Sequence, residues 1–477
     1  MKKYYIILGL LVFCFVAQGQ VDYNKYFTDQ CLRIDYFHSG SQSEEFVVID
    51  EMYRLPEWSG NPAGLIDTLN LGTYQVKVFD AATSALIYST GFNTLFNEWQ
   101  TTNEALHGGK KIMSETVRIP FPRREIQVDF LRRDDENHFT KKISTWIIDP
   151  ASPNIRKENR AVGTTVYDIQ NGGDYQHKAD LAILAEGYTA DEAKKFESDA
   201  RRLSDILFGA EPFKKHRKDF NVYAVFKPSS GSGPDNPRLN EYHNTVLNSS
   251  FNTFGSQRYL MTFDNKDLQD MASAVPFDVV YILVNSKIYG GGGIYNLYAC
   301  CVADNELSNY IFLHEFGHSF GGLGDEYYTS DVAYNEFYPE NVEPWEPNLT
   351  VLLDPKKVKW SSFMDANTPV PTPWNKKEYD EENEKYSETF AELKGKPMSA
   401  PSKEIKKIRS RHHDWIENFF NNHPYHNKVG VFEGAGYASN GIYRPSLDCI
   451  MFSARNVPFD PVCRAAIEKR IRFFARQ

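Results

Sequence analysis

The sequence predicts an α+β, multidomain fold: an amino-terminal β-sandwich over residues 20–155, followed by an α/β domain over residues 163–477. Two observations predict this division. Apolar and polar residues alternate along the first part of the chain, whereas apolar strands alternate with helices along the second. Between them lies the polar stretch 149–163, which contains two prolines and has the composition of a linker. A chain of 477 residues is long enough for two or three domains.

The expected sandwich rests on short segments in which every second residue is apolar, the pattern of strands that bury one face. Turn-forming Gly, Pro, Asn and Asp separate these segments, and few helical stretches intervene, so two packed sheets fit best. The segments are "LRIDYF" (32–37), "YQVKVF" (74–79), "TVRIPF" (116–121), "REIQVDFL" (124–131) and "STWIID" (144–149). Either a spacer or folding partner, or a ligand-binding domain, would have this pattern, because a fold does not determine a function.

The second domain is expected to be a layered α/β structure. Buried strands are indicated at "ADLAILAEGY" (179–188), "FNVYAVF" (220–226) and "FDVVYILV" (277–284). The helix after the first of these strands carries four apolar residues on one face: Phe196, Ala200, Leu203 and Leu207. A later helix is expected over residues 403–420.

Composition excludes some classes of partner. Hydrophobic residues make up 41% and charged residues 24%, an ordinary balance for a globular protein. The formal net charge is −10, and no basic stripe with interleaved aromatic residues is present, so no nucleic-acid partner is expected. Beyond residue 19 the chain has five cysteines, an odd number in which Cys300 and Cys301 are adjacent, so no disulfide scaffold is expected. No paired C-x-x-C spacing indicates structural zinc.

The first nineteen residues have the features of a signal peptide. Lys2 and Lys3 precede an apolar run from 4 to 16, and Ala17-Gln18-Gly19 forms a small-x-small cleavage site. The run is short for a membrane span, and no other segment is long enough, so no transmembrane segment is expected. We therefore expect a chain that is secreted, periplasmic or displayed at the cell surface. Lipidation of Cys14 is the alternative, although Cys14 lies inside the apolar run instead of closing it.

The strongest motif is "LHEFGHSFGGLGDEYY" (313–328). In a helix His314 and His318 lie one turn apart on the same face, so both imidazoles can reach one metal ion. Zinc suits neutral imidazole ligands. Glu315 is offset in angle, so that it can reach a metal-bound water and accept its proton as the water attacks a carbonyl. A helix that carries this H-E-x-x-H pattern without a metal is the alternative.

The residues after the two histidines favour the metal. Gly321, Gly322 and Gly324 can end the helix sharply, because glycine tolerates left-handed φ, and the chain can then double back. This reversal would bring Asp325 or Glu326 to the metal as a third ligand. Three protein ligands with one open position is the arrangement of catalytic zinc.

These residues carry a family resemblance. "HEFGHSFGGLGDEY" resembles the zinc-binding signature of the IgA-peptidase family of bacterial zinc metallopeptidases, within the zincin group. The resemblance extends over most of residues 165–477. Its supporting segments are "DLAILAEGYT" (180–189), "EPF" (211–213), "YGGGGIYNLYACC" (289–301) and "YRPSLDCIM" (443–451). The β-rich start is similar to the amino-terminal domain that accompanies this peptidase.

The resemblance implies a role for each matching residue. His314 and His318 would bind Zn²⁺, Asp325 would be the third ligand, and Glu315 would be the general base. One departure keeps Glu326 open as a ligand: the position of the third histidine in the longer metzincin pattern H-E-x-x-H-x-x-G-x-x-H falls here on Gly324. Met451 resembles the methionine that lies beneath the metal in metzincins. A core methionine is the alternative.

The expected function is therefore that of a secreted zinc endopeptidase, which hydrolyses an extended polypeptide substrate, such as a host protein or glycoprotein, with metal-activated water. Two other classes stay open: a secreted protein- or glycan-binding protein with an inactive peptidase-like domain, and a zinc amidase that acts on cell-wall material. The sequence does not identify the natural substrate, the oligomeric state or the group that stabilises the oxyanion; Tyr327 and Tyr443 are among the tyrosines available.

The segment before the metal helix predicts how a substrate lies. From Ile294 onward the residues fall into two alternating sets, Ile294, Asn296 and Tyr298 against Tyr295, Leu297 and Ala299, which suits a strand with one buried face. Four glycines precede it at 290–293. Glycines permit close approach of another backbone. We expect an edge strand to which a peptide adds by backbone hydrogen bonds. A flexible glycine loop is the alternative.

Overall fold

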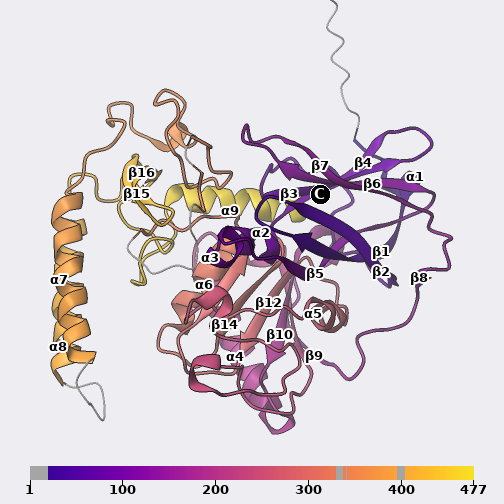
Figure 1. Ribbon diagram of the computed structural model, residues 1–477, viewed down its shortest axis with the longest axis horizontal. Coiled ribbons are helices and arrows are strands. Elements are labelled where there is room, and N and C mark those ends of the chain that lie inside the picture. Colours follow the sequence, from indigo (N-terminus) through magenta and orange to yellow (C-terminus); the bar gives the residue numbers. More distant parts are fainter. Residues whose placement is uncertain (1–19, 329–336, 340, 395–402, 477) are drawn as a thin grey trace, which may run out of the picture.

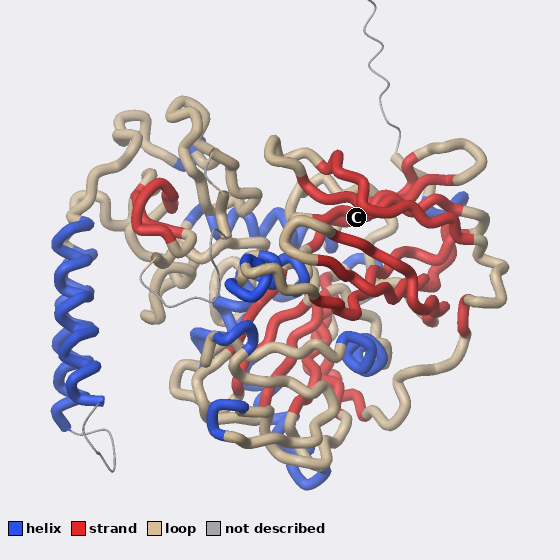
Figure 2. The backbone as a smooth tube through the Cα atoms, in the orientation of Figure 1, coloured by secondary structure: helices blue, strands red, loops and turns tan. Residues whose placement is uncertain are grey.

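The computed structural model describes residues 20–328, 337–339, 341–394 and 403–476 (Figure 1). The expected signal peptide, residues 1–19, lies outside the described residues. The first part of the chain is rich in strands and the second mixes strands and helices, as expected (Figure 2). None of the described helices is both long and apolar enough to cross a membrane.

The amino-terminal region contains two four-stranded sheets. One has the order β5-β1-β2-β8 and the other β4-β3-β6-β7. The strands of the first are β1 (Phe27–Gly40), β2 (Glu45–Leu55), β5 (Lys111–Pro122) and β8 (Ile155–Arg156). Those of the second are β3 (Tyr74–Asp80), β4 (Leu86–Phe92), β6 (Ile126–Arg133) and β7 (Phe139–Ile148). All neighbours pair antiparallel except β2 and β8, and β8 lies inside the stretch expected to be a linker.

The two sheets enclose one hydrophobic core, which makes this region a sandwich. Side chains from both sheets meet there; the rings of Tyr36 on β1 and Phe130 on β6 lie 5.3 Å apart, edge to face. Three short helices accompany the sheets: α1 (Tyr23–Tyr26), α2 (Leu95–Gln100) and α3 (Asn103–Leu106). Helix α2 begins where the Thr94 side chain accepts the N–H of Asn97 at 3.1 Å.

The second region is built on a six-stranded sheet of order β13-β14-β12-β10-β11-β9. The four central strands run parallel and the two edge strands antiparallel. Every residue of β10 and β12 is buried, as in sheets that are covered on both faces. The strands are β9 (Thr165–Gln170), β10 (Ala179–Glu186), β11 (Phe220–Phe226), β12 (Val279–Val284), β13 (Gly291–Ile294) and β14 (Tyr298–Val302).

Helices cover this sheet. Helix α6 (Ser308–Ser319) packs against β13 and β14, and α4 (Ala193–Leu207) packs against α6 and β11, so the two share a face. The expected apolar face of α4 is buried. Helix α5 (Asn265–Ala272) lies between the sheet and β5 of the sandwich, and α9 (Pro461–Phe474) follows near the end of the described chain.

The remaining elements lie beside the sheet. β15 (Phe432–Ala435) and β16 (Ala438–Arg444) form a hairpin, while α7 (Lys376–Lys394) and α8 (Lys403–Asn421) project together at the left of Figure 1. Helix α8 confirms the helix expected over 403–420. Six short 3-10 turns complete the set: Tyr175–His177, Ala190–Glu192, Arg217–Asp219, Pro237–Leu239, Thr253–Gly255 and Ser361–Phe363.

The glycine segment before α6 corrects one expectation. No strand begins at Ile294. Instead the chain forms a hairpin in which β13 contains the glycines, residues 295–297 turn, and β14 returns. The turn is possible because Asn296 takes φ +54°, a left-handed value that asparagine tolerates better than most residues. The expected edge position is correct, since β13 is the outermost strand of the sheet.

Buried ion pairs join the sandwich to the second region. Arg33 on β1 donates from Nη1 to Asp270 of α5 at 2.5 Å and holds Asp35 with two hydrogen bonds of 2.8 Å. The Asn61 side chain donates to the carbonyl oxygen of Phe474, in α9, at 2.7 Å. The sandwich is therefore fixed against the second region at both α5 and α9.

Candidate active site

Helix α6 presents two histidines toward a turn made by glycines. The helix reverses where Gly322 takes φ +65°, its N–H donates to the His318 carbonyl at 3.0 Å, and the N–H of Leu323 donates to Gly317 at 3.2 Å. A side chain on Gly321 would lie 2.7 Å from the Gly317 carbonyl oxygen, so the tight reversal requires glycine there. The chain then runs back across the end of the helix and carries Asp325 toward the histidines.

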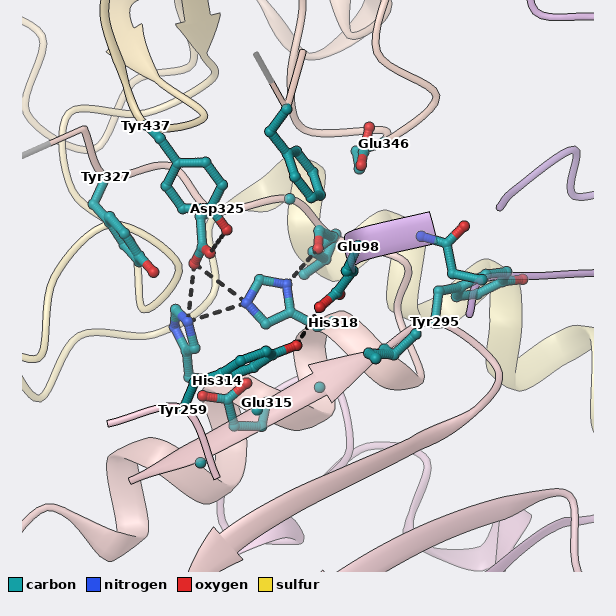
Figure 3. Close-up of a pocket in the computed structure, with 18 of the residues that line it drawn as sticks. Glu98, Tyr259, Tyr295, His314, Glu315, His318, Asp325, Tyr327, Glu346 and Tyr437 are labelled. Atoms are coloured by element: carbon teal, nitrogen blue, oxygen red, sulfur yellow. Dashed lines mark hydrogen bonds and ion pairs between the residues drawn. The ribbon is translucent and has the colours of Figure 1, made fainter. Parts of the chain in front are cut away.

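Three potential ligand atoms converge at this point (Figure 3). The Nε2 atoms of His314 and His318 lie 3.1 Å apart, and Asp325 Oδ1 lies 3.0 Å from the first and 3.2 Å from the second. Ligands about 2.05 Å from a tetrahedral zinc ion are about 3.3 Å apart, which is close to all three separations.

The hydrogen bonds behind the rings explain why a cation fits. Nδ1 of His314 contacts the carbonyl oxygen of Ile450 at 2.9 Å, and Nδ1 of His318 contacts that of Leu323 at 2.6 Å. A carbonyl can only accept, so both Nδ1 atoms carry protons and the lone pair of each neutral ring lies on Nε2. Two imidazole lone pairs and a carboxylate oxygen directed at one point repel one another unless a cation lies between them. The donor set therefore fits a divalent metal such as zinc.

A proton on His318 can take the place of the metal at this point, and the charges favour it. Burial alone would lower the pKa of His318, but the Asp325 carboxylate outweighs it and raises this pKa to about 9. Burial would likewise raise the pKa of Asp325, yet the two imidazoles hold it well below its usual range. The other oxygen of Asp325, Oδ2, accepts a hydrogen bond from the Tyr437 hydroxyl at 2.5 Å. Asp325 thus remains a carboxylate, oriented for a positive charge.

Glu326 points elsewhere, although the sequence left it open as the third ligand. Its Oε1 accepts hydrogen bonds from Asn348 Nδ2 at 2.9 Å and from the Cys463 thiol at 3.2 Å. Of these two neighbouring carboxylates, Asp325 is the one that contacts the imidazoles, because successive residues of an extended segment face opposite sides.

Glu315 lies beside the edge strand, with its Cγ 3.3 Å from the position that a side chain on Gly291 would occupy. Burial raises its pKa, while the two histidines lower it by a smaller amount. A carboxyl whose pKa is raised toward neutrality is a better general base. Glu315 also lies close to the two histidines: one potential ligand atom from each of Glu315, His314 and His318 lies within 4.8 Å of the others.

Met451 lies beneath the helix, where its Sδ is 2.8 Å from the position that a side chain on Gly317 would occupy. It is fully buried, and its carbonyl oxygen accepts the N–H of Glu326 at 2.9 Å. Among the oxyanion candidates, Tyr327 lines the pocket, and its hydroxyl accepts a hydrogen bond from Arg258 Nη2 at 3.2 Å. Tyr443 is not among the described residues that line the pocket, and its backbone pairs with Thr350.

The pocket also contains residues that the motif did not indicate. Asn93 and Glu98, from the amino-terminal region, line one wall, and the Tyr259 hydroxyl donates to Glu98 Oε2. Glu346 lines the same pocket (Figure 3). No sequence signal could have found Asn93 and Glu98, since they reach the pocket only through packing of the sandwich. The sandwich is thus part of the cleft rather than a detached spacer.

Comparison with known families gives two matches. The family model described as "IgA Peptidase M64" matches residues 167–471, and the one described as "Peptidase M64 N-terminus" matches residues 22–144. No curated protein matches the chain at a significant level. The first match includes the histidine helix, its glycine turn and the segment around Met451. The second covers most of the sandwich.

Proposed function

The chain belongs to the IgA peptidase M64 family, and from this membership we propose that it is a secreted zinc endopeptidase in which Glu315 is the general base. Membership makes the chain a metallopeptidase, a hydrolase that acts on polypeptides. The identity of the metal, the roles of single residues and export are the proposed part.

One observation carries the assignment of the site: the convergence of His314 Nε2, His318 Nε2 and Asp325 Oδ1 within 3.2 Å of one another. Imidazole nitrogen with carboxylate oxygen is a ligand set that zinc accepts. When bound, zinc would act as a Lewis acid that activates water and polarises the scissile carbonyl. An inactive binding protein would have no need to keep Glu315 at this position as well.

The chain's own residues supply the remaining chemistry. Glu315 would take the proton of the attacking water and then deliver it to the leaving amine. Tyr327, whose hydroxyl accepts a hydrogen bond from Arg258, would donate a hydrogen bond to the developing oxyanion, a contribution that commonly is about 3 kcal/mol. The chain belongs to a family of peptidases, whose substrates are polypeptides. This membership favours the peptidase over an amidase that acts on cell-wall material.

The substitution Glu315→Gln tests the mechanism. The amide can still hydrogen-bond water but cannot accept its proton, so peptide hydrolysis should fall by about 10²–10⁴-fold while zinc content stays the same. Glu306→Gln is the matched control, because Glu306 is exposed near the start of the same helix. Hydrolysis by Glu315→Gln at the control rate would remove Glu315 from the mechanism. Zinc binding without hydrolysis of any peptide library by the wild type would favour the binding protein.

The signal peptide supports export. We expect residues 1–19 to be removed and the mature chain to begin near Gln20. The intact mass of the protein recovered from the native organism measures this directly. A mass that includes Lys2 and Lys3, or one that starts at a lipid-carrying Cys14, would contradict cleavage at this site.

A further inference from the structure

A second cluster of metal-ligating side chains lies next to the histidine site. Glu326, Cys449, Asp460 and Cys463 each contribute one atom to a group in which all atoms lie within 4.8 Å of one another, and all four residues are buried. Glu326 follows the glycine turn after α6, Cys449 lies in the segment before α9, and Asp460 and Cys463 belong to the start of α9. The chain thus gathers two thiols and two carboxylates from distant positions.

We propose that this cluster is a structural metal site, separate from the histidine site. The Sγ atoms of Cys449 and Cys463 lie 3.9 Å apart, and Cys463 Sγ lies 3.2 Å from Glu326 Oε1. Sulfurs about 2.3 Å from a tetrahedral zinc ion are about 3.8 Å apart. A disulfide would need the two sulfurs at about 2.05 Å. The spacing is that of two thiolates on one ion.

In each of the two carboxylates, Asp460 and Glu326, one oxygen accepts hydrogen bonds and the other does not. Asp460 Oδ1 caps α9 by accepting the N–H groups of Val462 and Cys463 at 2.7 and 2.8 Å, and Glu326 Oε1 accepts from Asn348. Over the described residues, Asp460 Oδ2 and Glu326 Oε2 are buried without a hydrogen-bond partner. An ionised carboxylate is costly to bury unless it is paired or binds a metal. A metal would use the two free oxygens.

Cys449 is oriented to be a metal ligand. Its Sγ accepts the N–H of Met451 at 3.5 Å and that of Asp460 at 3.4 Å, contacts that orient and stabilise a sulfur ligand. The neighbouring cation, Arg444, donates to the carbonyl oxygens of Gly434 and Leu447. The guanidinium of Arg444 is thus hydrogen-bonded to the main chain. A divalent cation would offset the negative charge of the four acidic groups far better.

The ligand set indicates the kind of ion. Thiolate ligands select zinc over magnesium or calcium, which prefer oxygen alone. Four protein ligands without an open position are typical of structural zinc, whereas the histidine site has three. The cluster could not be recognised in the sequence, because Cys449 and Cys463 are not in a C-x-x-C pair and Glu326 is more than a hundred residues away.

An ion here would also position the catalytic histidine. Cys449 directly precedes Ile450, whose carbonyl oxygen orients His314, and Glu326 directly follows Asp325. Glu326 and Met451 are joined by a backbone hydrogen bond of 2.9 Å. A metal that joins Glu326 to Cys449 would fix the two segments that hold the histidine site together.

Metal content and cobalt spectroscopy of the full chain test this site without relying on hydrolysis. We expect two metal ions per wild-type chain. Replacement of zinc by Co²⁺ should produce the near-ultraviolet charge-transfer band of thiolate-bound cobalt, which the histidine site cannot give because it has no sulfur. A single ion without this band would overturn the proposal.

Matched variants separate the two sites. His314→Ala/His318→Ala should lose one ion and keep the band, whereas Cys449→Ser/Cys463→Ser should lose the band. Cys31→Ser, a buried thiol of the sandwich, is the control and should keep both ions. A band that disappears with the histidines would overturn the proposal. So would a thiol titration of the denatured wild-type chain from residue 20 onward in which only three of its five cysteines react, since that would mean a disulfide.

Discussion

His38 is a fully buried histidine between two carboxylates. Its Nδ1 lies 2.7 Å from Glu115 Oε2 and its Nε2 lies 2.7 Å from Glu45 Oε1, while the ring stacks on Phe96 at 4.1 Å. Burial would lower the pKa of His38, but the carboxylates outweigh it and raise this pKa to about 9. Burial would raise the pKa of Glu45, yet the contacts with His38 and Arg132 lower it to about 2.

These shifts predict how stability depends on pH. A raised histidine pKa stabilises the fold fully below the unfolded value of 6.5 and is lost as pH rises through about 9. The lowered pKa of Glu45 stabilises above the unfolded value of 4.5 and is lost as pH falls toward about 2. The free energy of unfolding should therefore fall between about pH 6.5 and 9, by on the order of 3 kcal/mol.

Urea unfolding at several pH values measures this loss. In His38→Gln the uncharged amide cannot titrate, so the decline above pH 6.5 should be smaller by the share of His38, and the part that remains is due to His318, whose pKa is also raised to about 9. The variant is less stable at every pH. Exposed His138 provides a control in His138→Gln, which should decline as the wild type does. An equal decline in His38→Gln would contradict the buried charge.

At the same scale, local spacing predicted the histidine pair and the glycine turn, because four residues make one helical turn. The sequence could not predict that Asp325, rather than Glu326, contacts the two histidines. This depends on which side of the segment after Gly322 faces them. Nor could Tyr437, which contacts Asp325 from 112 residues away. The roles of the site residues remain predictions.

Among the elements, β13 is the one expected to pair with the substrate backbone. Gly291 faces outward and its edge is occupied: its N–H donates to Arg258 at 3.2 Å and its carbonyl accepts from Leu260 at 3.3 Å. By the alternation of antiparallel strands, Gly293 is the next residue to face outward. Within the described chain its N–H and C=O have no backbone partner on that side. A substrate backbone would pair there.

Peptides with a single N-methyl group test this docking. When the methylated nitrogen is the one that pairs with Gly293, kcat/KM should fall by about 5–10-fold, the loss of one hydrogen bond. Methylation one residue to either side, where the N–H points away, is the control and should matter little. Equal effects at all positions would exclude pairing at this edge.

Substitution of the glycines themselves would be a poorer test. A side chain on Gly292 would lie 2.4 Å from Met261 Sδ, and one on Gly293 would lie 2.4 Å from the Glu315 carbonyl oxygen. These glycines are therefore needed for packing against α6 and residues 251–261, a close approach within the protein that the sequence could not distinguish from approach by a substrate. The expected strand from Ile294 onward was wrong because residues 295–297 form the turn between β13 and β14.

In the molecule as a whole, the two regions share Asp270. Arg33 contacts it from the sandwich and is 1% exposed, whereas Arg160, whose side chain is 35% exposed, contacts the other carboxylate oxygen at 2.8 Å. Removing one partner of a buried pair costs about 3–5 kcal/mol, because the other charge stays buried. An exposed pair contributes about 0–1 kcal/mol.

Thermal unfolding of two variants measures this difference. Arg33→Met should be destabilised by about 3–5 kcal/mol and Arg160→Met, the control, by less than about 1 kcal/mol. Because Arg33 joins the two regions, both should unfold at the lower temperature. A transition in which only the sandwich unfolds early would show that the regions are energetically independent.

On this scale the sequence predicted both regions and the order of the main strands and helices along the chain. It could not predict that Asn93 and Glu98 reach the cleft. That contact depends on how two separately patterned regions pack, which short-range periodicity does not encode. By contrast, the run of small and branched residues in 179–188 was sufficient to predict a buried strand. This pattern is local, so it can be recognised without knowing which other segments pack against it.

The hydrogen bond between His314 and Ile450 has a consequence for the synthesis of the chain. The two residues are separated by 136 positions, so the ribosome releases the histidine helix long before the carbonyl that orients it. A nascent chain that already carries the whole H-E-x-x-H motif still lacks the segment that fixes the ring. The histidine site can therefore be completed only after the segment around Ile450 has been synthesised.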